Sequence, residues 1–435
     1  MRKIQISIFF LLLSCALMGC SRNEEAASDQ STSIATVEDS EESAAKASDH
    51  GIQMYSRGAG ADESSQAEEH LKEMTLEQKV GQLFLLSFRK SEKDETVYKI
   101  TSSMRETLES FQPCGIILFD ENIDSVKQVQ EFIADAQSTA KIPLFVSTDQ
   151  EGGRVQRLKH SDKIPVTDIP PMANLGRTTN VTLSRDVGHV IGQELSVFGF
   201  NMDYAPDCDV NSNPDNTVIG DRAFSQDPQI AADMSTALAL GMRDYGVIPV
   251  CKHFPGHGDT SQDSHDGYAS SAKTLEQLWQ TELIPFAEQI ENGAPAIMVA
   301  HISLPNVTKD KIPASLNPVI IHDLLREKMG YDGLLITDAL DMGAITQNYS
   351  SAEAAVAAVQ AGIDILLMPE DPQAAYEGIL KAVEDGEISE DQIDQSVLRI
   401  LSVKYAYGLF EEHELPPADV LGCKAHRDII SQINQ

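Results

Sequence analysis

The sequence predicts an α/β fold, a (β/α)8 barrel of the TIM type within a single domain. Short, almost continuously apolar segments of strand length alternate along the chain with amphipathic segments of helical length. Strands that are apolar on both faces are typical of a parallel sheet covered by helices. About eight such units follow one another over roughly 340 residues, which fits a closed (β/α)8 barrel with insertions.

The expected strands are the eight apolar segments at 81–88, 115–120, 142–149, 200–210, 247–254, 295–303, 333–340 and 364–370. The expected helices lie between them at 125–141, 182–198, 228–245, 275–292, 318–329 and 351–361, and a last helix covers 389–407. Thr75 and Gln78 have the spacing of a capping box, which marks the start of the ordered chain. A doubly wound open sheet would show the same alternation, but no GxGxxG motif follows the first expected strand.

The chain starts with a segment that predicts export. Arg2 and Lys3 precede an apolar run at 4–18, which is short for a membrane span. The run ends in Leu-Met-Gly-Cys20, which resembles a bacterial lipobox. We therefore expect residues 1–19 to be a lipoprotein signal peptide and Cys20 to carry the lipid that anchors an extracytoplasmic protein to the bacterial cell membrane. A plain signal peptide with an incidental cysteine is the alternative, and it also implies a location outside the cytoplasm.

Residues 20–69 are rich in Ser, Ala, Glu and Asp and poor in large apolar side chains, so burial cannot compensate the entropy of ordering them. We expect a disordered acidic tether there, followed at 70–435 by the barrel domain with a C-terminal helical tail. With 67 acidic and 33 basic residues, the chain has a formal net charge of −34 and would repel nucleic acid. The four cysteines after Cys20 are scattered and predict neither a disulfide framework nor a metal site.

Ionisable residues follow several of the expected strands. Asp149 ends the third strand, Lys252 and His253 end the fifth, and Asp338 ends the seventh. A single aspartate after a strand is often only a helix N-cap. In a barrel of this type, however, the carboxyl ends of all strands meet at the face that carries the active site. Charged residues at several of these ends therefore predict a functional site there.

Three histidines, His253, His257 and His265, lie close together in the sequence and could suggest a metal site. Proline and glycine between the first two rule out a regular helix, and no glutamate follows His253 as it does in zincins. We therefore expect no metal and no organic cofactor, and His257 receives no role. The interpretation we prefer is a pair of Asp263 and His265, in which the carboxylate orients the imidazole and the imidazole transfers protons.

Asp338 supplies the nucleophile that a pair of Asp263 and His265 lacks. An aspartate at the rigid end of a strand can attack an anomeric carbon and form a covalent intermediate. The imidazole can then protonate the leaving group and later take a proton from water. Without Asp338, the polarity of a surface loop would explain Asp263 and His265 equally well.

Four segments carry a resemblance to a known family. KHFPGHGDT at 252–260, followed by DSH at 263–265, resembles the signature of bacterial β-N-acetylglucosaminidases of glycoside hydrolase family 3. DQEGGRVQR at 149–157, GDRAF at 220–224 and ITDAL at 336–340 resemble three further motifs of that family, in the same order. The similarity covers residues from about 75 to 410, nearly all of the expected ordered chain.

The resemblance implies a single catalytic domain with a retaining mechanism. Asp338 would be the nucleophile, and His265, oriented by Asp263, would act first as general acid and then as general base. The family's sugar-binding positions fall on Asp149, Arg157, Arg222, Lys252 and His253. The implied activity is that of an exo-acting β-N-acetylhexosaminidase that hydrolyses terminal β-linked N-acetylglucosamine from peptidoglycan fragments through a covalent glycosyl-aspartate, as a monomer and without a cofactor.

Other interpretations stay open at this point. For Arg157 and Arg222, structural ion pairs at the barrel rim would explain the same residues. A histidine acid/base would not repel an anionic acceptor, so a phosphorylase that uses phosphate in place of water is a rival. A lipoprotein that only binds wall sugars is another, although such a protein would tend to lose Asp338, Asp263 or His265. Only 25 residues follow Phe410, so we expect no second α/β sandwich domain.

Overall fold

The computed structural model describes residues 61–91, 95–260 and 269–434. The proposed lipidation site Cys20, the signal peptide, most of the expected tether, and both Asp263 and His265 lie outside these residues. Within the described part of the chain, no helix is long and apolar enough to span a membrane.

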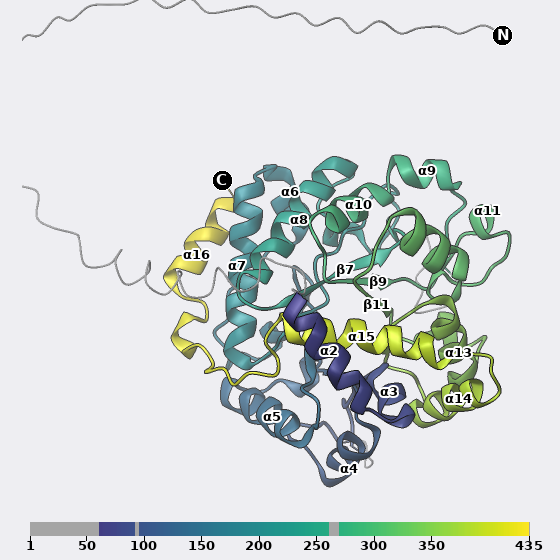
Figure 1. The fold of residues 1–435 in the computed structure, drawn as a ribbon. Helices are drawn as coiled ribbons and strands as arrows, with labels where there is room; N and C mark the ends of the chain where they lie inside the picture. Colours follow the sequence, from purple (N-terminus) through teal and green to yellow (C-terminus); the bar gives the residue numbers. More distant parts are fainter. Residues whose placement is uncertain (1–60, 92–94, 261–268, 435) are drawn as a thin grey trace, which may run out of the picture. The chain divides into compact units, whose positions relative to one another are not determined.

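Eight parallel strands form the barrel (Figure 1). They are β1 (Phe84–Ser87), β2 (Gly115–Ile117), β3 (Phe145–Thr148), β6 (Met202–Asp203), β7 (Ile248–Phe254), β9 (Ala296–Val299), β11 (Leu334–Thr337) and β12 (Leu366–Leu367). Their order in the sheet is β11-β9-β7-β6-β3-β2-β1-β12. The two outer strands also meet, because Ile336 in β11 pairs with Ile365 just before β12, and the Thr337 amide donates to the Ile365 carbonyl at 3.0 Å. The sheet is thus nearly closed, and the predicted barrel is confirmed.

Each of the eight expected strand segments contains one of these strands. The strands are shorter than the segments, since the apolar runs continue into buried turns at both ends. Nearly every strand residue is buried, which is why the runs are apolar without alternation. The shortest are β6 and β12, with two residues each.

Helices surround the sheet. The long ones are α2 (Ala61–Glu73), α4 (Ser102–Phe111), α5 (Val126–Thr139), α7 (Val181–Phe198), α8 (Pro228–Arg243), α10 (Leu283–Glu291), the π-helical η5 (Val319–Lys328), α13 (Ser351–Ala361), α14 (Pro372–Glu384), α15 (Glu390–Ala406) and α16 (Lys424–Ser431). Shorter ones are α3 (Leu76–Gln82), α6 (Met172–Thr178), α9 (Leu275–Gln280), α11 (Pro305–Thr308) and α12 (Gly343–Thr346). Most expected helices are confirmed to within a few residues, and α4 and α14 were not expected.

Two local features have a clear cause in the sequence, one that was predicted and one that was missed. Thr75 caps α3 in the predicted capping box with Gln78. The prediction of a single helix at 275–292 is wrong, because the segment breaks at Thr281 into α9 and α10. Pro285 lacks an amide hydrogen, and in a continuous helix its ring would clash with the carbonyl of Thr281 four residues earlier.

Close approach of α7 and α8 depends on glycine. A Cβ atom added to Gly188 would lie 2.2 Å from the Leu238 carbonyl oxygen, and one added to Gly241 would lie 2.2 Å from that of Arg185. A side chain at either position would push the two helices apart. The contact keeps α7 and α8 packed as one layer outside β6 and β7, the two strands that carry much of the candidate site.

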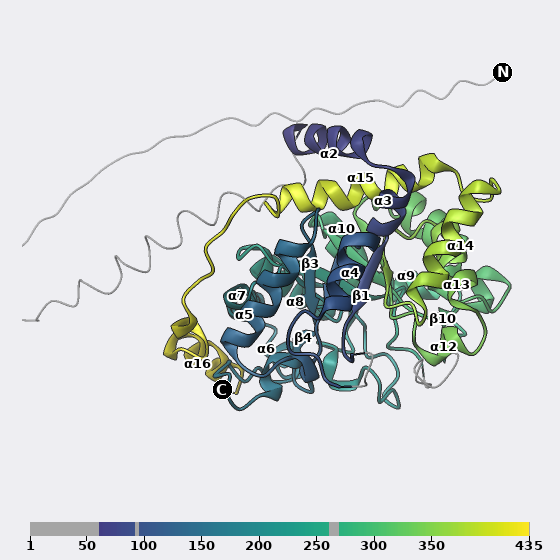
Figure 2. The same cartoon turned by 90° about the horizontal axis from the view of Figure 1, so that it is seen from below.

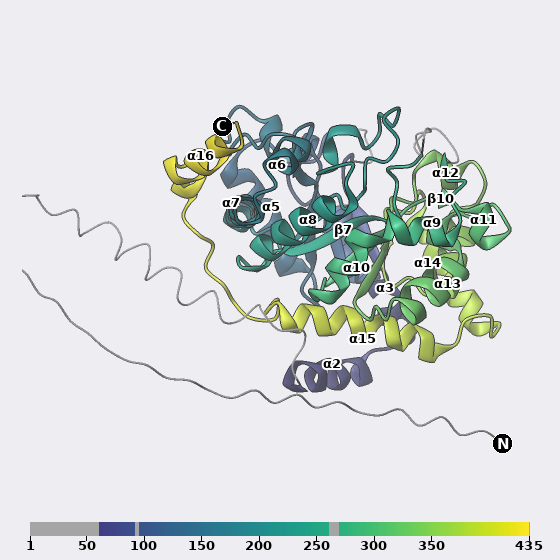
Figure 3. The same cartoon turned by 90° about the horizontal axis from the view of Figure 1, so that it is seen from above.

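The end of the barrel opposite the site is covered by α15, with α2 packed on its outer side (Figures 2 and 3). The His70 ring in α2 bonds the Tyr405 hydroxyl at 3.2 Å, and Tyr405 stacks on Phe410 at 4.0 Å between ring centroids. The expectation of a disordered tether is therefore wrong for residues 61–69, which belong to α2. This short segment of good helix formers buries Ala67 against the domain, which favours an ordered helix.

Lys404 of α15 points into this end of the barrel. Its side chain is fully buried, its ammonium donates to Gln82 Oε1 at 2.9 Å, and it lies over the Phe145 ring at 5.0 Å from the centroid. None of the described acidic side chains pairs with it. Burial lowers the pKa of Lys404 to about 8, because a charged amine is poorly solvated there.

Replacement of Lys404 by Met should therefore change stability in a pH-dependent way. Between pH 8 and about 10.4 the unfolded chain binds more protons at this lysine than the folded chain does, so the wild type gains stability as the pH rises. The stability of Lys404→Met relative to wild type should fall by roughly 3 kcal/mol across this window. Urea unfolding at pH 7, 9 and 10.5 measures it. Lys127→Met, at an exposed position, is the control, and parallel pH profiles for Lys404→Met and wild type would contradict the assignment.

Candidate active site

The site residues lie where the parallel strands end. Asp149 follows β3 directly, Lys252 and His253 lie near the end of β7, and Asp338 follows β11. Arg157 and Arg222 come from short 3-10 helices, η2 (Arg157–His160) and η3 (Gly220–Arg222), which lie in the segments after β3 and β6. Since the carboxyl ends of parallel strands share one face of a barrel, these residues can converge despite their distance in sequence.

A chain of ion pairs begins at Lys252. Its ammonium lies 2.8 Å from Asp149 Oδ1 and 2.6 Å from Glu151 Oε1, with 3% of the side chain exposed. Arg157 contacts the other oxygen of Asp149 at 3.2 Å. Burial alone would raise the pKa of Asp149, but the charges of Lys252 and Arg157 outweigh it and lower that pKa. Burial likewise opposes protonation of Lys252, yet its two carboxylate partners raise its pKa.

Glu151 links Lys252 to Arg222. The Arg222 guanidinium makes two parallel hydrogen bonds of 2.8 Å to the two oxygens of Glu151. This bidentate geometry fixes the plane of the guanidinium. Glu151 is almost fully buried, and the charges of Arg222 and Lys252 overcome its burial and lower its pKa. Glu151 lies inside the motif at 149–157 but was not predicted as a site residue.

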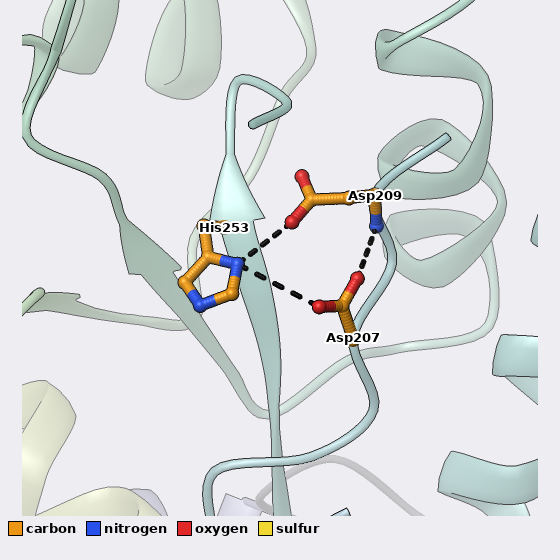
Figure 4. Close-up of side chains that lie close together, drawn as sticks. All are labelled: Asp207, Asp209 and His253. Carbon is orange, nitrogen blue, oxygen red and sulfur yellow. Dashed lines mark hydrogen bonds and ion pairs between the residues drawn. The ribbon is translucent and has the colours of Figure 1, made fainter. Parts of the chain in front are cut away.

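His253 is oriented by a second pair of acids that the sequence analysis also missed. Its Nδ1 lies 2.7 Å from Asp209 Oδ2 and 4.0 Å from Asp207 Oδ2, and the Asp209 amide donates to Asp207 Oδ1 at 3.0 Å (Figure 4). Arg222 approaches the opposite ring nitrogen, Nε2, at 3.3 Å. The signal was present at the end of the apolar segment 200–210, where Asp207 and Asp209 fit the same strand-end pattern.

These contacts determine the tautomer of His253. Arginine can only donate, so Nε2 must be the acceptor and Nδ1 must carry the hydrogen that is donated to Asp209. Burial, followed by the charge of Arg222, lowers the pKa of His253 to about 4, so the imidazole is neutral at pH 7. Burial, together with the charge of Asp209, raises the pKa of Asp207 to about 7.

Asp207, Asp209 and His253 are also the described residues that could hold a metal ion, since one donor atom from each lies within 4.8 Å of the others. Two features fit such an ion poorly. Nδ1 carries a proton that Asp209 already accepts, and the Arg222 Nε atom lies 3.5 Å from Asp207 Oδ2 and supplies a positive charge. The cluster is better explained as the support of His253.

Asp338 lies at the opening of the site and is partly exposed. Its amide donates to the Val299 carbonyl at 2.9 Å, and its Oδ1 accepts the Ala339 amide at 2.8 Å. Burial disfavours its charged form, but His301, His253 and the Ala339 amide together lower its pKa below the ordinary value. The carboxylate is therefore ionised at neutral pH and has one oxygen that no described residue binds.

His301 is another functional candidate that the sequence analysis missed. It follows β9, at the end of the sixth expected strand, so the strand-end pattern that selected Asp338 applied to it as well. Its side chain is fully buried beside Asp338. His257, to which no role was assigned, is buried, its amide donates to Asp209, and its ring bonds Thr260 at 2.8 Å. His257 thus shapes the loop after β7.

Asp263 and His265 lie outside the described residues, so their roles remain predictions. The chain on both sides of them is described. Ser271 donates to Asp259 Oδ2 at 2.6 Å and so joins the two sides, while β8 (Ala269–Ser270) pairs with β10 (Ile302–Ser303). On the other side of the site, β4 (Gln150–Gly152) and β5 (Val155–Gln156) form a hairpin that carries Glu151.

The structure thus brings together all five predicted substrate-binding residues, Asp149, Arg157, Arg222, Lys252 and His253, through one connected set of contacts. The ion pairs of Arg157 and Arg222 that the sequence left open as a structural explanation are present. They leave 27% of the Arg157 side chain and 13% of that of Arg222 exposed. A binding role for these residues is therefore compatible with their pairing.

Comparisons with known proteins agree with this geometry. A 365-residue match to β-hexosaminidase A of Pseudoalteromonas piscicida has 32% identity and covers 76% of this chain and 61% of that protein. β-Hexosaminidase LpqI of Mycobacterium tuberculosis is 37% identical over 271 residues, 60% of this chain and 68% of that protein. The solved structure of a glycoside hydrolase family 3 β-N-acetylglucosaminidase from Paenibacillus sp. FPU-7 superposes with a TM-score of 0.78 at 38% identity, covering 83% of this chain and 68% of that one.

The family follows from a match that covers more than half of the chain. Residues 75–403 match the N-terminal domain of glycosyl hydrolase family 3. That range begins at the Thr75 cap of α3 and ends within α15, so it contains the whole barrel and every described residue of the site. The chain therefore belongs to glycosyl hydrolase family 3.

Proposed function

We propose that this protein is an exo-acting, retaining β-N-acetylhexosaminidase that releases terminal β-linked N-acetylglucosamine from peptidoglycan fragments. The observation that carries the proposal is the Asp338 carboxylate, which is held ionised at the mouth of the barrel next to His253 and a connected set of polar groups. The relatives named β-hexosaminidase and β-N-acetylglucosaminidase support the choice of sugar. The chain spans 61% of the length of the first of these relatives.

The reaction needs two displacements at the anomeric carbon. The free oxygen of Asp338 attacks C1, the bond between C1 and the glycosidic oxygen breaks, and His265 gives its proton to that oxygen. Water then attacks C1 of the glycosyl ester, gives a proton to His265 and releases the Asp338 carboxylate. Two inversions return the β configuration. Asp263 would hold the imidazole in the required tautomer.

The charged residues around Asp338 would hold the sugar. Asp149 can accept hydrogen bonds from sugar hydroxyls, and Arg157, Arg222 and Lys252 can donate to hydroxyls and to the N-acetyl oxygen. The Arg157 side chain remains 27% exposed while it pairs with Asp149, which supports a bond to substrate. Since the ion pairs already fix these groups, little ordering would be needed when the sugar binds.

Lipidation at Cys20 would place this activity on the outer side of the cell membrane, close to wall fragments. The apolar run at 4–18 and the Leu-Met-Gly-Cys sequence support this location. We also propose that the enzyme needs no metal or organic cofactor, because its reaction uses only carboxylate and imidazole groups. We propose further that it acts as a monomer.

The substrate and the reaction can be tested together with the soluble fragment from about residue 70 and with the longer fragment from residue 61, which keeps all of α2. Both are incubated with p-nitrophenyl β-N-acetylglucosaminide and β-glucoside, with and without phosphate and EDTA. We expect cleavage of the N-acetyl substrate only, insensitive to EDTA, with free N-acetylglucosamine as product. A sugar 1-phosphate product would indicate a phosphorylase, and a folded protein that binds N-acetylglucosamine without turnover would indicate a binding protein.

Asp338→Asn should reduce kcat by about 10³-fold or more, because it replaces the only proposed nucleophile with a neutral amide of the same shape. Circular dichroism and the melting temperature should stay close to wild type. Asp332→Asn is the matched control, since Asp332 lies before β11 on an exposed position bonded to Arg399 and should leave kcat unchanged. Near-normal turnover by Asp338→Asn would remove the nucleophile assignment.

His265→Ala should slow substrates in proportion to how poor their leaving groups are. A p-nitrophenolate leaves with little protonation, whereas a sugar alkoxide needs a proton, so we expect about 10²- to 10⁴-fold loss on a disaccharide and a much smaller loss on the aryl glycoside. Steady-state kinetics on both substrates provide the comparison. An equal loss on the two substrates would contradict the acid role.

A further inference from the structure

His301 lies between the strand that precedes it, β9, and the segment that carries Asp338. Its Nε2 atom is 2.9 Å from the Ala339 carbonyl oxygen, and its Nδ1 atom is 2.7 Å from the Ser315 hydroxyl. Ser315 is held in turn by its amide, which donates to the Ala300 carbonyl at 3.1 Å. The ring is fully buried, so neither contact is exchanged for water.

The contacts assign the hydrogen of the ring. A backbone carbonyl can only accept, so Nε2 carries the hydrogen that is donated to Ala339. In the neutral imidazole Nδ1 accepts from the Ser315 hydroxyl. In the protonated ring, whose charge lowers the pKa of Asp338, Nδ1 donates to that hydroxyl instead. Both nitrogens are satisfied in one orientation, which fixes the ring in the plane of the Ala339 carbonyl.

Ala339 is the residue on which the aim of the carboxylate depends. The Asp338 amide donates to Val299, and the Leu340 amide donates to the Leu367 carbonyl, each at 2.9 Å, so both neighbours of Ala339 are tied to adjacent strands. The Ala339 amide instead binds Asp338 Oδ1 at 2.8 Å, and its carbonyl binds His301. Rotation of the Ala339 backbone would break the second contact and move the amide that orients the carboxylate.

We propose that His301 is a positioning residue for the reaction, which fixes the Ala339 backbone through its Nε2 hydrogen and thereby aims the nucleophilic oxygen of Asp338 at the anomeric carbon. The inference rests on the proposed function, in which Asp338 is the nucleophile. His301 touches neither the sugar nor the leaving group in this proposal and acts only through Ala339 and Asp338.

The same arrangement has an electrostatic consequence. Among the described side chains, those that act on the Asp338 carboxylate are His301 after β9, His253 and Lys252 in β7, and His257 after β7. Among the side chains, His301 does most to lower the pKa of Asp338 against the effect of burial. Loss of His301 should therefore raise that pKa, and activity should then be lost at a higher pH as the solution is acidified.

The experiment compares four variants of the enzyme that is active in the p-nitrophenyl assay. His301→Ala removes both contacts, and His301→Gln can keep a donor toward Ala339 and an acceptor toward Ser315. Ser315→Ala leaves the ring in place but removes its orienting partner. His322→Ala is the control, because His322 is exposed on η5 and contacts Asp323 rather than the site. The readouts are kcat, KM, the pH profile of kcat/KM, the melting temperature and the rate at which a 5-fluoro N-acetylglucosaminyl fluoride labels Asp338.

For His301→Ala we expect kcat and the labelling rate to fall by about 10- to 100-fold, as a misaimed nucleophile would cause. KM should change little, and the acid limb of kcat/KM should move to higher pH. His301→Gln should recover part of the rate, Ser315→Ala should show a smaller loss of the same kind, and His322→Ala should match wild type. If His301→Ala does not fold, His301→Gln and Ser315→Ala supply the same comparison with wild type.

One outcome would overturn the positioning role alone. In it, the wild-type enzyme is labelled at Asp338, and His301→Ala has the same kcat, labelling rate and acid limb of kcat/KM as the wild type. A lower melting temperature with an unshifted pH profile that His301→Gln does not improve would also overturn that role, because this pattern would indicate packing only. An active wild type that is labelled at a residue other than Asp338 would instead overturn the nucleophile assignment, and this inference would fall with it.

Discussion

The Lys252 ammonium lies between the carboxylates of Asp149 and Glu151 with almost no access to water, and the rest of the site is arranged around this buried charge. An isolated ammonium at such a depth would lose its proton, and an isolated carboxylate would gain one. Because positive and negative groups alternate, Lys252, Asp149 and Glu151 can all stay charged. Arg222 continues the alternation from Glu151, so removal of one member would leave its neighbour as an uncompensated buried charge.

The network also decides which groups are neutral. Burial, and then the charges of Arg222 and Lys252 that keep Glu151 ionised, disfavour a proton on His253, which stays neutral and uses its Nδ1 hydrogen for Asp209. A neutral ring beside Asp338 adds no charge to the site. Asp338 has no ion pair with any described residue, and His301, His253 and the Ala339 amide lower its pKa instead. A carboxylate without a cationic partner in direct contact is more available for attack on carbon.

Rigid strands supply the precision that this arrangement needs. Asp149, Lys252 and Asp338 are each tied to strands of one nearly closed sheet, whose backbone bonds hold their relative positions. The helix layer contributes indirectly, as the close packing of α7 on α8 through Gly188 and Gly241 supports β6 and β7 from outside. His301 and Ser315 extend this support to the turn after β11, where the peptide between Ala339 and Leu340 is bonded to Leu367 through its amide and to His301 through its carbonyl.

The sequence by itself determined the alternation of strands and helices, hence the barrel, and it identified Asp149, Lys252, His253 and Asp338, because period and strand-end position are local properties of a chain. The four motifs added Arg157 and Arg222, and they supported the pair Asp263–His265, whose roles stay predictions. Only the tertiary structure assigned partners to these residues. Glu151, Asp209 and His301 acquire their roles from residues far away in sequence, and the ordering of residues 61–69 depends on α15, more than 300 residues later. Pairwise distances and burial set protonation and tautomer, and no sequence pattern contains them.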